Sequence, residues 1–252
     1  MTELFLCFFA LLAGFLDSIV GGGGLIQTPA LLILLPKFEV ATLFGTNKLV
    51  SITGTSVAAV QFSRRVKLDL GVTIPAAVAA FAASMAGARL VTLVDSNVLR
   101  PVVLVFMILV ALYSAWRPDL GNVHAPKLTG RKMTLFAIAT GLGLGFYDGF
   151  FGPGTGTFLV FAFVTLFGFD FLSASASAKI VNVGTNLAAL ILFASTRHVL
   201  YLVAFPMMAC NMTGAILGSR FAILRGNTIV RKIFLWVVTL VILRYAWDIF
   251  HH

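Results

Sequence analysis

The sequence predicts an all-α integral membrane protein. Of its 252 residues, 60% are hydrophobic and only 11% are charged, whereas soluble domains carry roughly 25% charged residues. The hydrophobic residues form segments of about helix-spanning length, without the alternating pattern of membrane barrel strands. A third observation is an internal duplication, because the first half of the chain recurs in the second half at a constant offset of 131 residues.

Five hydrophobic segments are expected in each half. They cover residues 4–20, 25–35, 43–62, 70–94 and 98–116, and then 135–151, 157–167, 174–194, 200–221 and 229–250. The second segment of each half has only 11 residues, too few to cross about 30 Å of hydrocarbon at about 1.5 Å per residue. We therefore expect the first two segments of each half to be short helices that meet at a break.

The expected breaks are glycine motifs. Asp17 is followed by glycines at 21–24, and Asp148 is followed by glycines at 149, 152, 154 and 156. Glycine interrupts a helix and leaves backbone groups that lipid cannot satisfy, so each break must be buried in protein or line a polar cavity. Broken helices at matching positions of two halves are typical of the substrate site of a transporter.

The duplication is visible in rare residue types. Adding 131 to the residue number carries Gly14 to Gly145, Asp17 to Asp148, Lys48 to Lys179, Pro75 to Pro206, Arg89 to Arg220 and Trp116 to Trp247. Because each half has an odd number of segments, the two repeats are expected to enter the membrane in opposite orientations. The first repeat is predicted at 1–116 and the second at 133–250, with a polar cytoplasmic linker at 117–132 between them.

The basic residues predict the orientation of the chain in the membrane. With the N-terminus outside, the inner loops carry eleven Lys and Arg residues and the outer loops four. Since basic residues favour the cytoplasmic side, both termini are predicted to be periplasmic. The net charge of +9 is then explained by topology, and no nucleic-acid partner is expected.

The third segment of each half carries polar residues on one helical face, at positions i, i+3 and i+7. These are Lys48, Ser51 and Thr55 in the first repeat and Lys179, Asn182 and Asn186 in the second, with Asn47 beside Lys48. Lysine supplies positive charge, and hydroxyl and amide groups donate hydrogen bonds to anion oxygens. The pattern favours a site for a small anion, although a lysine in a membrane helix can also extend to the lipid interface.

Backbone N–H groups at the starts of the short helices would add donors to this site. The candidates are Gly22, Gly23, Gly154 and Thr155. Asp17 and Asp148 have three open interpretations: ion pairs with the lysines, caps of the short helices, or carriers of protons for coupled transport. No metal or cofactor site is expected.

Four motifs resemble those of the sulfite exporter TauE/SafE family, also called the toluene sulfonate uptake permease family. They are Asp-x-x-x-Gly-x-Gly from residue 17, Gly-Thr-Asn-Lys at 45–48, the glycine motif at 145–156, and Ala-Lys-Ile-Val-Asn at 178–182. The resemblance extends over nearly the whole chain. It implies a bacterial inner-membrane transporter for sulfite, organosulfonates or related small anions, which moves them with or against protons.

The leading hypothesis is secondary active transport of a small sulfur oxyanion or organosulfonate by alternating access, coupled to protons, without enzymatic activity. A passive anion channel is an alternative. An intramembrane aspartyl protease is a weaker one, because the Gly-x-Gly-Asp sequence of such enzymes is absent and two nearby lysines do not suit a proton-sharing aspartate pair. The sequence also has no phosphate-binding loop for ATP, so any pumping must draw on an ion gradient.

Overall fold

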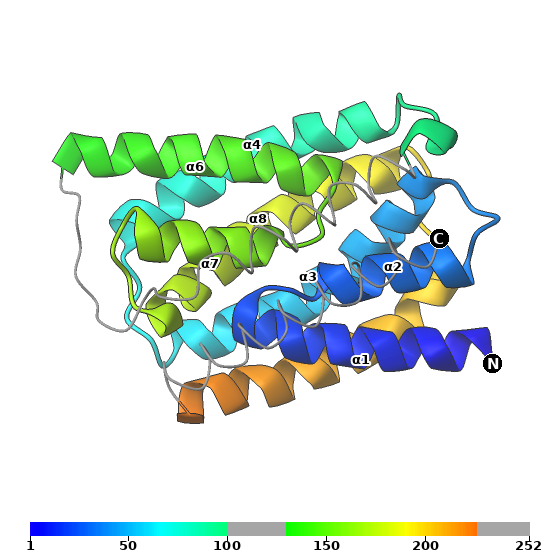
Figure 1. Ribbon diagram of the computed structural model, residues 1–252, viewed down its shortest axis with the longest axis horizontal. Coiled ribbons are helices and arrows are strands. Elements are labelled where there is room, and N and C mark those ends of the chain that lie inside the picture. The colour runs from blue at the N-terminus through cyan, green and yellow to red at the C-terminus, as the bar shows by residue number, and fades with distance from the viewer. Residues whose placement is uncertain (100–129, 226–252) are drawn as a thin grey trace, which may run out of the picture.

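The computed structural model describes residues 1–99 and 130–225, which form helices and their connections without any strand (Figure 1). The first half contains α1 (Thr2–Val20), α2 (Gly24–Leu34), α3 (Val40–Ser63) and α4 (Leu70–Val91), and the second contains α6 (Gly130–Phe150), α7 (Thr155–Thr165), α8 (Phe171–Ser195) and a last helix, Tyr201–Arg225. The all-α prediction is confirmed. The segment expected at 229–250, nearly all of the one at 98–116, and residues 117–129 of the expected linker lie outside the described residues.

Five of these helices are long and apolar enough to cross a membrane: α1, α4, α6, α8 and the last helix. The short second segments are confirmed, since α2 and α7 have 11 residues each. The prediction of short first segments is wrong, because α1 has 19 residues and α6 has 21, or about 28 and 32 Å of helix. Polar residues at the start of both helices continue the helical backbone, and hydropathy alone omits them.

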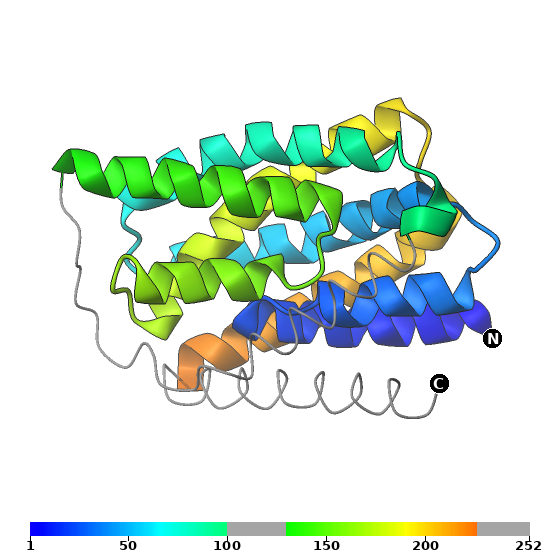
Figure 2. The ribbon, with the colours of Figure 1, turned by 45° about the horizontal axis from the view of Figure 1, so that its top comes forward.

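Each half packs its long helices against the other half. In two views, α4 lies beside α6, and α1 lies beside the last helix (Figure 1 and Figure 2). Glycine makes the close approach possible, because a Cβ atom at Gly145 or Gly149 would overlap the backbone of α4. Likewise, a Cβ atom at Gly14 would overlap the backbone of the last helix, and one at Gly214 would overlap the backbone of α1. Small residues at such crossings are typical of helix association in membranes.

The polypeptide runs in opposite directions in α1 and α6, which lead from right to left and from left to right in Figure 1. The loop after α3, the start of α6 and the end of the last helix lie at one end of the bundle, and the loops after α2, α4 and α8 lie at the other. The first end carries Arg64, Arg65, Lys67, Arg131, Lys132, Arg220 and Arg225, and the second carries Lys37, Arg89 and Arg197. Among the described residues, the basic residues therefore number seven at one end and three at the other.

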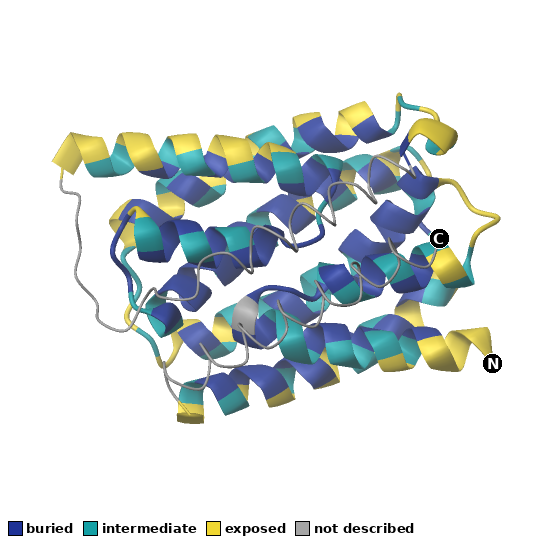
Figure 3. Cartoon of the chain, in the orientation of Figure 1, coloured by how far each residue is buried: buried dark blue, intermediate teal, exposed yellow. Residues whose placement is uncertain are grey.

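Helix α8 lies at the centre of the bundle. The buried share of its candidate membrane span is 61%, against 28% for that of α6. The burial colouring shows exposed residues along α6 and at the two ends of the bundle (Figure 3). Packed phenylalanines hold α7 against the loop that leads to α8, with the Phe163 ring 5.7 Å from that of Phe167 and 5.9 Å from that of Phe169. Lys179, Asn182 and Asn186 of α8 are therefore in the protein interior.

Candidate functional site

The structure confirms a helix break at each glycine motif. Gly21 follows α1 with φ of 83°, and its N–H donates to the carbonyl of Asp17 at 2.7 Å. Gly152 follows α6 with φ of 85°, and its N–H donates to the carbonyl of Tyr147 at 3.3 Å. Glycine adopts this left-handed backbone without the steric cost of a side chain. Each break thus comes four residues after an aspartate.

The two breaks contact each other. The backbone N–H of Thr157 donates to the carbonyl of Gly21 at 3.1 Å. Gly156 lies so close to Gly21 that a Cβ atom on either residue would overlap the backbone of the other. Two interruptions far apart in sequence therefore form one non-helical region inside the bundle, where protein groups replace the water that such backbone needs.

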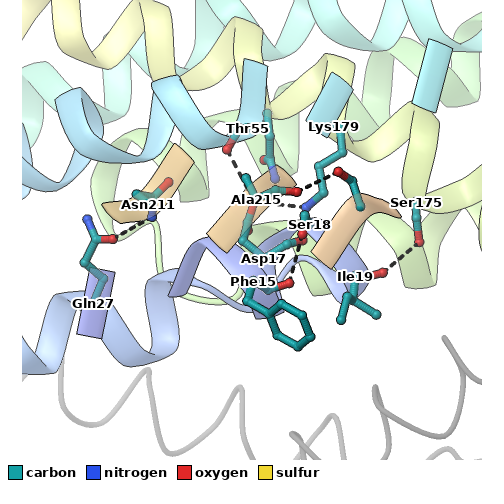
Figure 4. Close-up of polar contacts among 12 residues, drawn as sticks. Phe15, Asp17, Ser18, Ile19, Gln27, Thr55, Ser175, Lys179, Asn211 and Ala215 are labelled. Atoms are coloured by element: carbon teal, nitrogen blue, oxygen red, sulfur yellow. Dashed lines mark hydrogen bonds and ion pairs between the residues drawn. The ribbon is translucent and has the colours of Figure 1, made fainter. Parts of the chain in front are cut away.

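The two lysines form ion pairs with aspartates of the opposite half, and among the four side chains only that of Asp17 is half-buried, at 18% exposed. Lys48 Nζ lies 2.6 Å from Asp148 Oδ2, and Lys179 Nζ lies 3.0 Å from Asp17 Oδ2. Lys179 also donates to the backbone carbonyl of Asp17 (Figure 4). Lys48 is 3% exposed and Lys179 is fully buried, so neither side chain extends to a lipid interface.

Of the three interpretations of the aspartates, ion pairing matches the observed contacts. Helix capping is wrong, since the N-cap residues of α2 and α7 are Gly23 and Gly154 and neither helix start receives a side-chain cap. The geometry of the backbone explains this, because each aspartate belongs to the last turn of the preceding helix. Breaking a buried pair leaves one uncompensated charge, which costs about 3 to 5 kcal/mol.

A polar cavity lies between the breaks and the third helices of both halves. Its empty space amounts to about 330 Å³ when the part open to solvent is included. The lining residues are Asp17, Gly21, Gly24, Asn47, Lys48, Ser51, Thr55, Asp148, Gly152, Thr155, Gly156, Asn182 and Asn186. Most of the site residues expected from the sequence are thus brought together, while Lys179, Gly22, Gly23 and Gly154 are not among the described residues that line the cavity.

The two lysines are not equivalent in this structure. Lys48 lines the cavity, and among the described residues its ammonium has one hydrogen-bond partner, Asp148. Lys179 lies behind Asp17, bound to its carboxylate and to its backbone carbonyl. An ammonium group has three donors, so Lys48 retains donors that can reach a molecule in the cavity. The offset of 131 pairs the two lysines in sequence but does not reveal this difference.

The cavity offers further groups to an anion. The first residue of α2, Gly24, and the first two of α7, Thr155 and Gly156, line it, so both short helices direct their positive ends toward this space. The amide oxygens of Asn47 and Asn182 are buried there without a hydrogen-bond partner among the described residues. A ligand with both acceptor and donor atoms would satisfy these groups.

A second group of buried polar residues was missed by the sequence reasoning. Asn211 Nδ2 donates to the carbonyl of Ala10 at 3.0 Å and to Oε1 of Gln27 at 3.1 Å (Figure 4). Nε2 of Gln27 and Oγ1 of Thr28 are buried without a partner among the described residues. These are polar residues inside apolar segments, but they are not repeated in the other half of the chain. The offset of 131 places Phe158, Leu159 and Ala80 at the corresponding positions.

Known proteins resemble this chain over most of its length. It is 37% identical to the "Probable membrane transporter protein ORF9" of Sinorhizobium sp., over 98% of this chain and 93% of that protein. It is 37% identical to the "Probable membrane transporter protein YfcA" of Escherichia coli K12, over 96% of this chain and 89% of that protein. A "Probable membrane transporter protein" of Haemophilus influenzae is 36% identical, over 87% of this chain and 84% of that protein. No solved structure matches the chain.

The family model of the sulfite exporter TauE/SafE matches residues 6–245. The relatives are named as membrane transporters and not as enzymes, and each aspartate pairs with a lysine instead of with the other aspartate. The protease alternative is therefore set aside. From the match over nearly its whole length, this chain belongs to the sulfite exporter TauE/SafE family of membrane transporters.

Proposed function

We propose that this protein is a secondary active transporter that moves a small sulfur oxyanion or organosulfonate across the bacterial inner membrane. The family match makes it a membrane transporter, and the name of the family model supplies the class of substrate. The observation that supports the proposal best is the cavity beside Lys48, where a buried cation with unused donors faces a polar space.

In this proposal the anion binds to the ammonium of Lys48 in place of the carboxylate of Asp148. A buried anion needs positive charge, because hydrogen bonds from neutral donors do not offset the loss of hydration. Neutral side chains then orient the anion oxygens from two sides of the cavity. They are Asn47, Ser51 and Thr55 from α3, and Asn182 and Asn186 from α8.

Transport would proceed by alternating access between two inverted repeats, at 1–116 and 133–250. The opposite chain directions of α1 and α6 support this arrangement (Figure 1). The contact between the two glycine breaks gives a place where one repeat can move against the other. The end of the bundle with seven basic residues would face the cytoplasm, with the N-terminus in the periplasm.

Protons are the proposed coupling ion, and Asp17 and Asp148 are the proposed carriers. Both carboxylates line the cavity and both are paired with lysine. An anion that competes for a lysine would leave a carboxylate without its partner, and a proton would take the place of the lysine. Substrate binding and proton binding would then assist each other.

Flux into proteoliposomes tests this function. Purified protein is reconstituted, a pH gradient is imposed, and uptake of labelled sulfite, sulfate, thiosulfate, sulfoacetate and taurine is followed beside protein-free vesicles. We expect at least one of these compounds to accumulate above its external concentration, and to raise the melting temperature of the purified protein, because a ligand stabilises the folded state that binds it. A channel would only equilibrate the anion. Absence of any protein-dependent flux would contradict the proposal.

A further inference from the structure

Four ionisable side chains lie at the helix breaks, and their charges cancel. Lys48 and Asp148 form one ion pair, and Lys179 and Asp17 form the other. Lys48, Asp148 and Lys179 are buried, and the Asp17 side chain is 18% exposed. Elsewhere in residues 1–99 and 130–225 no charged side chain is buried, since Asp69 and Asp170 are half-buried at helix starts, His198 is half-buried in the loop after α8, and the others are exposed. Of these exposed residues, those on helices are Glu3, Arg89, Arg131, Lys132, Arg220 and Arg225, and those in the loop after α3 are Arg64, Arg65 and Lys67.

Helices α2 and α7 contain no charged residue at all. An anion that enters the cavity therefore meets a site whose net charge is zero. If both pairs remained ionised after it bound, the site would hold an unmatched negative charge beside the buried carboxylate of Asp148. Burial strongly disfavours such a state, and a buried carboxylate becomes neutral instead by taking up a proton.

On the basis of the transport function proposed above, we propose that each negative charge of the bound anion is accompanied by one proton, so that the loaded and empty sites have the same net charge. In the first step, Lys48 Nζ forms hydrogen bonds with the anion and its bond to Asp148 Oδ2 breaks. The released carboxylate takes one proton from water-borne hydronium and becomes a neutral acid, while Lys48 keeps its three protons. Transport of the loaded site is then electroneutral.

The geometry assigns the first proton to Asp148. Its partner Lys48 lines the cavity, and Lys48 is its one hydrogen-bond partner among the described residues. Asp17 is held more firmly, because Lys179 lies outside the cavity lining and Thr55 Oγ1 also donates to Asp17 Oδ2 at 3.3 Å. A monoanion therefore brings a proton to Asp148 alone, and a dianion brings a second proton to Asp17.

Proton uptake during binding measures this directly. Purified full-length protein in weakly buffered detergent is mixed with methanesulfonate or sulfate, which keep one and two negative charges at neutral pH. A pH-indicator dye counts the protons, and a thermal shift of the same sample reports binding. We expect about one proton per bound methanesulfonate and about two per bound sulfate, one for each charge that the site must neutralise. Asp148→Asn should remove one proton from each count, whereas the control Asp69→Asn, outside the cavity, should leave both counts unchanged.

The outcomes separate this inference from the proposed function. Binding of either anion without proton uptake would overturn the inference and leave the transporter proposal intact. Equal uptake for the two anions would also overturn it, and this comparison needs only the unmodified protein. Loss of the methanesulfonate proton in Asp17→Asn but not in Asp148→Asn would overturn the assignment to Asp148. If no anion in the flux and binding assays stabilises the protein, the proposed function fails and the inference fails with it.

Discussion

The ammonium of Lys48 and the carboxylate of Asp148 lie 2.6 Å apart, although 100 positions separate the two residues in sequence. In the matched pair, Lys179 Nζ lies 3.0 Å from Asp17 Oδ2, and 162 positions separate the two residues in sequence. Each pair joins the third segment of one half to the first segment of the other. The two halves of the protein are therefore connected by two ion pairs, of which Lys48–Asp148 is buried on both sides.

The first prediction concerns the stability of this connection. Lys48→Met leaves the buried carboxylate of Asp148 without its partner, so we expect a loss of about 3 to 5 kcal/mol in the free energy of unfolding. The double variant Lys48→Met/Asp148→Asn should be more stable than the sum of the single effects predicts, because neither charge is left alone. Chemical unfolding of the four proteins in detergent measures this coupling.

The surface pair of His198 and Glu39 is the control for this double-mutant comparison. Its Nε2 and Oε2 atoms lie 3.6 Å apart, and the Glu39 side chain is 71% exposed. Exposed pairs contribute about 0 to 1 kcal/mol, so His198→Gln and Glu39→Gln should show little coupling. Additive effects at Lys48 and Asp148 would mean that the buried pair is absent in the membrane protein.

A second prediction uses two glycines of the same helix. A Cβ atom at Gly149 would overlap the backbone of Ser84 on α4, whereas one at Gly143 would meet nothing within 4 Å. We expect Gly149→Ala to force α4 and α6 apart and to lower the melting temperature strongly. Gly143→Ala should leave it unchanged or raise it, since alanine favours a helix over glycine by about 1 kcal/mol. Equal melting temperatures for the two variants would argue against the α4–α6 contact.

A third prediction separates coupling from structure at the aspartates. If Asp148 carries a coupling proton, Asp148→Asn removes the titrating group and should abolish accumulation driven by a pH gradient. Exchange of internal for external substrate requires no net proton movement and should continue. Both fluxes are measured in the same proteoliposome preparation. If Asp148→Asn prevents folding instead of removing only the coupling to protons, the ion pair of Asp148 with Lys48 has a structural role.

A fourth prediction concerns the sidedness of the membrane protein. Single cysteines at Lys37 and Asp95, in loops at the end with three basic residues, should react with an impermeant maleimide from the periplasm. A cysteine at Lys67, in the loop after α3 at the opposite end (Figure 1), should react only from the cytoplasm. If the cysteines introduced at Lys37 and Lys67 react from the same side of the membrane, the expected topology is wrong.

Much of the architecture could be predicted because the physical signals are local. Hydropathy located the helices, and glycines placed the breaks at Gly21 and Gly152, where the backbone takes a left-handed conformation. The length of α1 and α6 was underestimated, since polar residues at a helix start lower the hydropathy of a segment without ending the helix. The polar stripe from Lys48 to Thr55 was identified from helical periodicity, and it lines the cavity.

The rest depended on contacts between distant residues. Sequence symmetry suggested that Lys48 and Lys179 would act alike on one ligand, but Lys179 is bound to Asp17 behind the cavity lining. The pairing of each lysine with an aspartate was one of three open interpretations, and the choice required the tertiary arrangement. Gln27 and Asn211 were overlooked because they have no polar counterpart in the other half.

The central claim is that Lys48 is the cation that binds the anion. The most direct test is to measure how tightly two charge-balanced variants bind the anion that the flux assay identifies. The variants are Lys48→Met/Asp148→Asn and Lys179→Met/Asp17→Asn. Arg89→Met is the control for a basic residue outside the site. Loss of a charged hydrogen bond of about 1.5 to 3 kcal/mol should weaken binding by about tenfold or more in the Lys48 variant. The Lys179 variant should lose less affinity, because Lys179 does not line the cavity in the part of the chain that the structure describes. A folded Lys48 variant with unchanged affinity would contradict the claim.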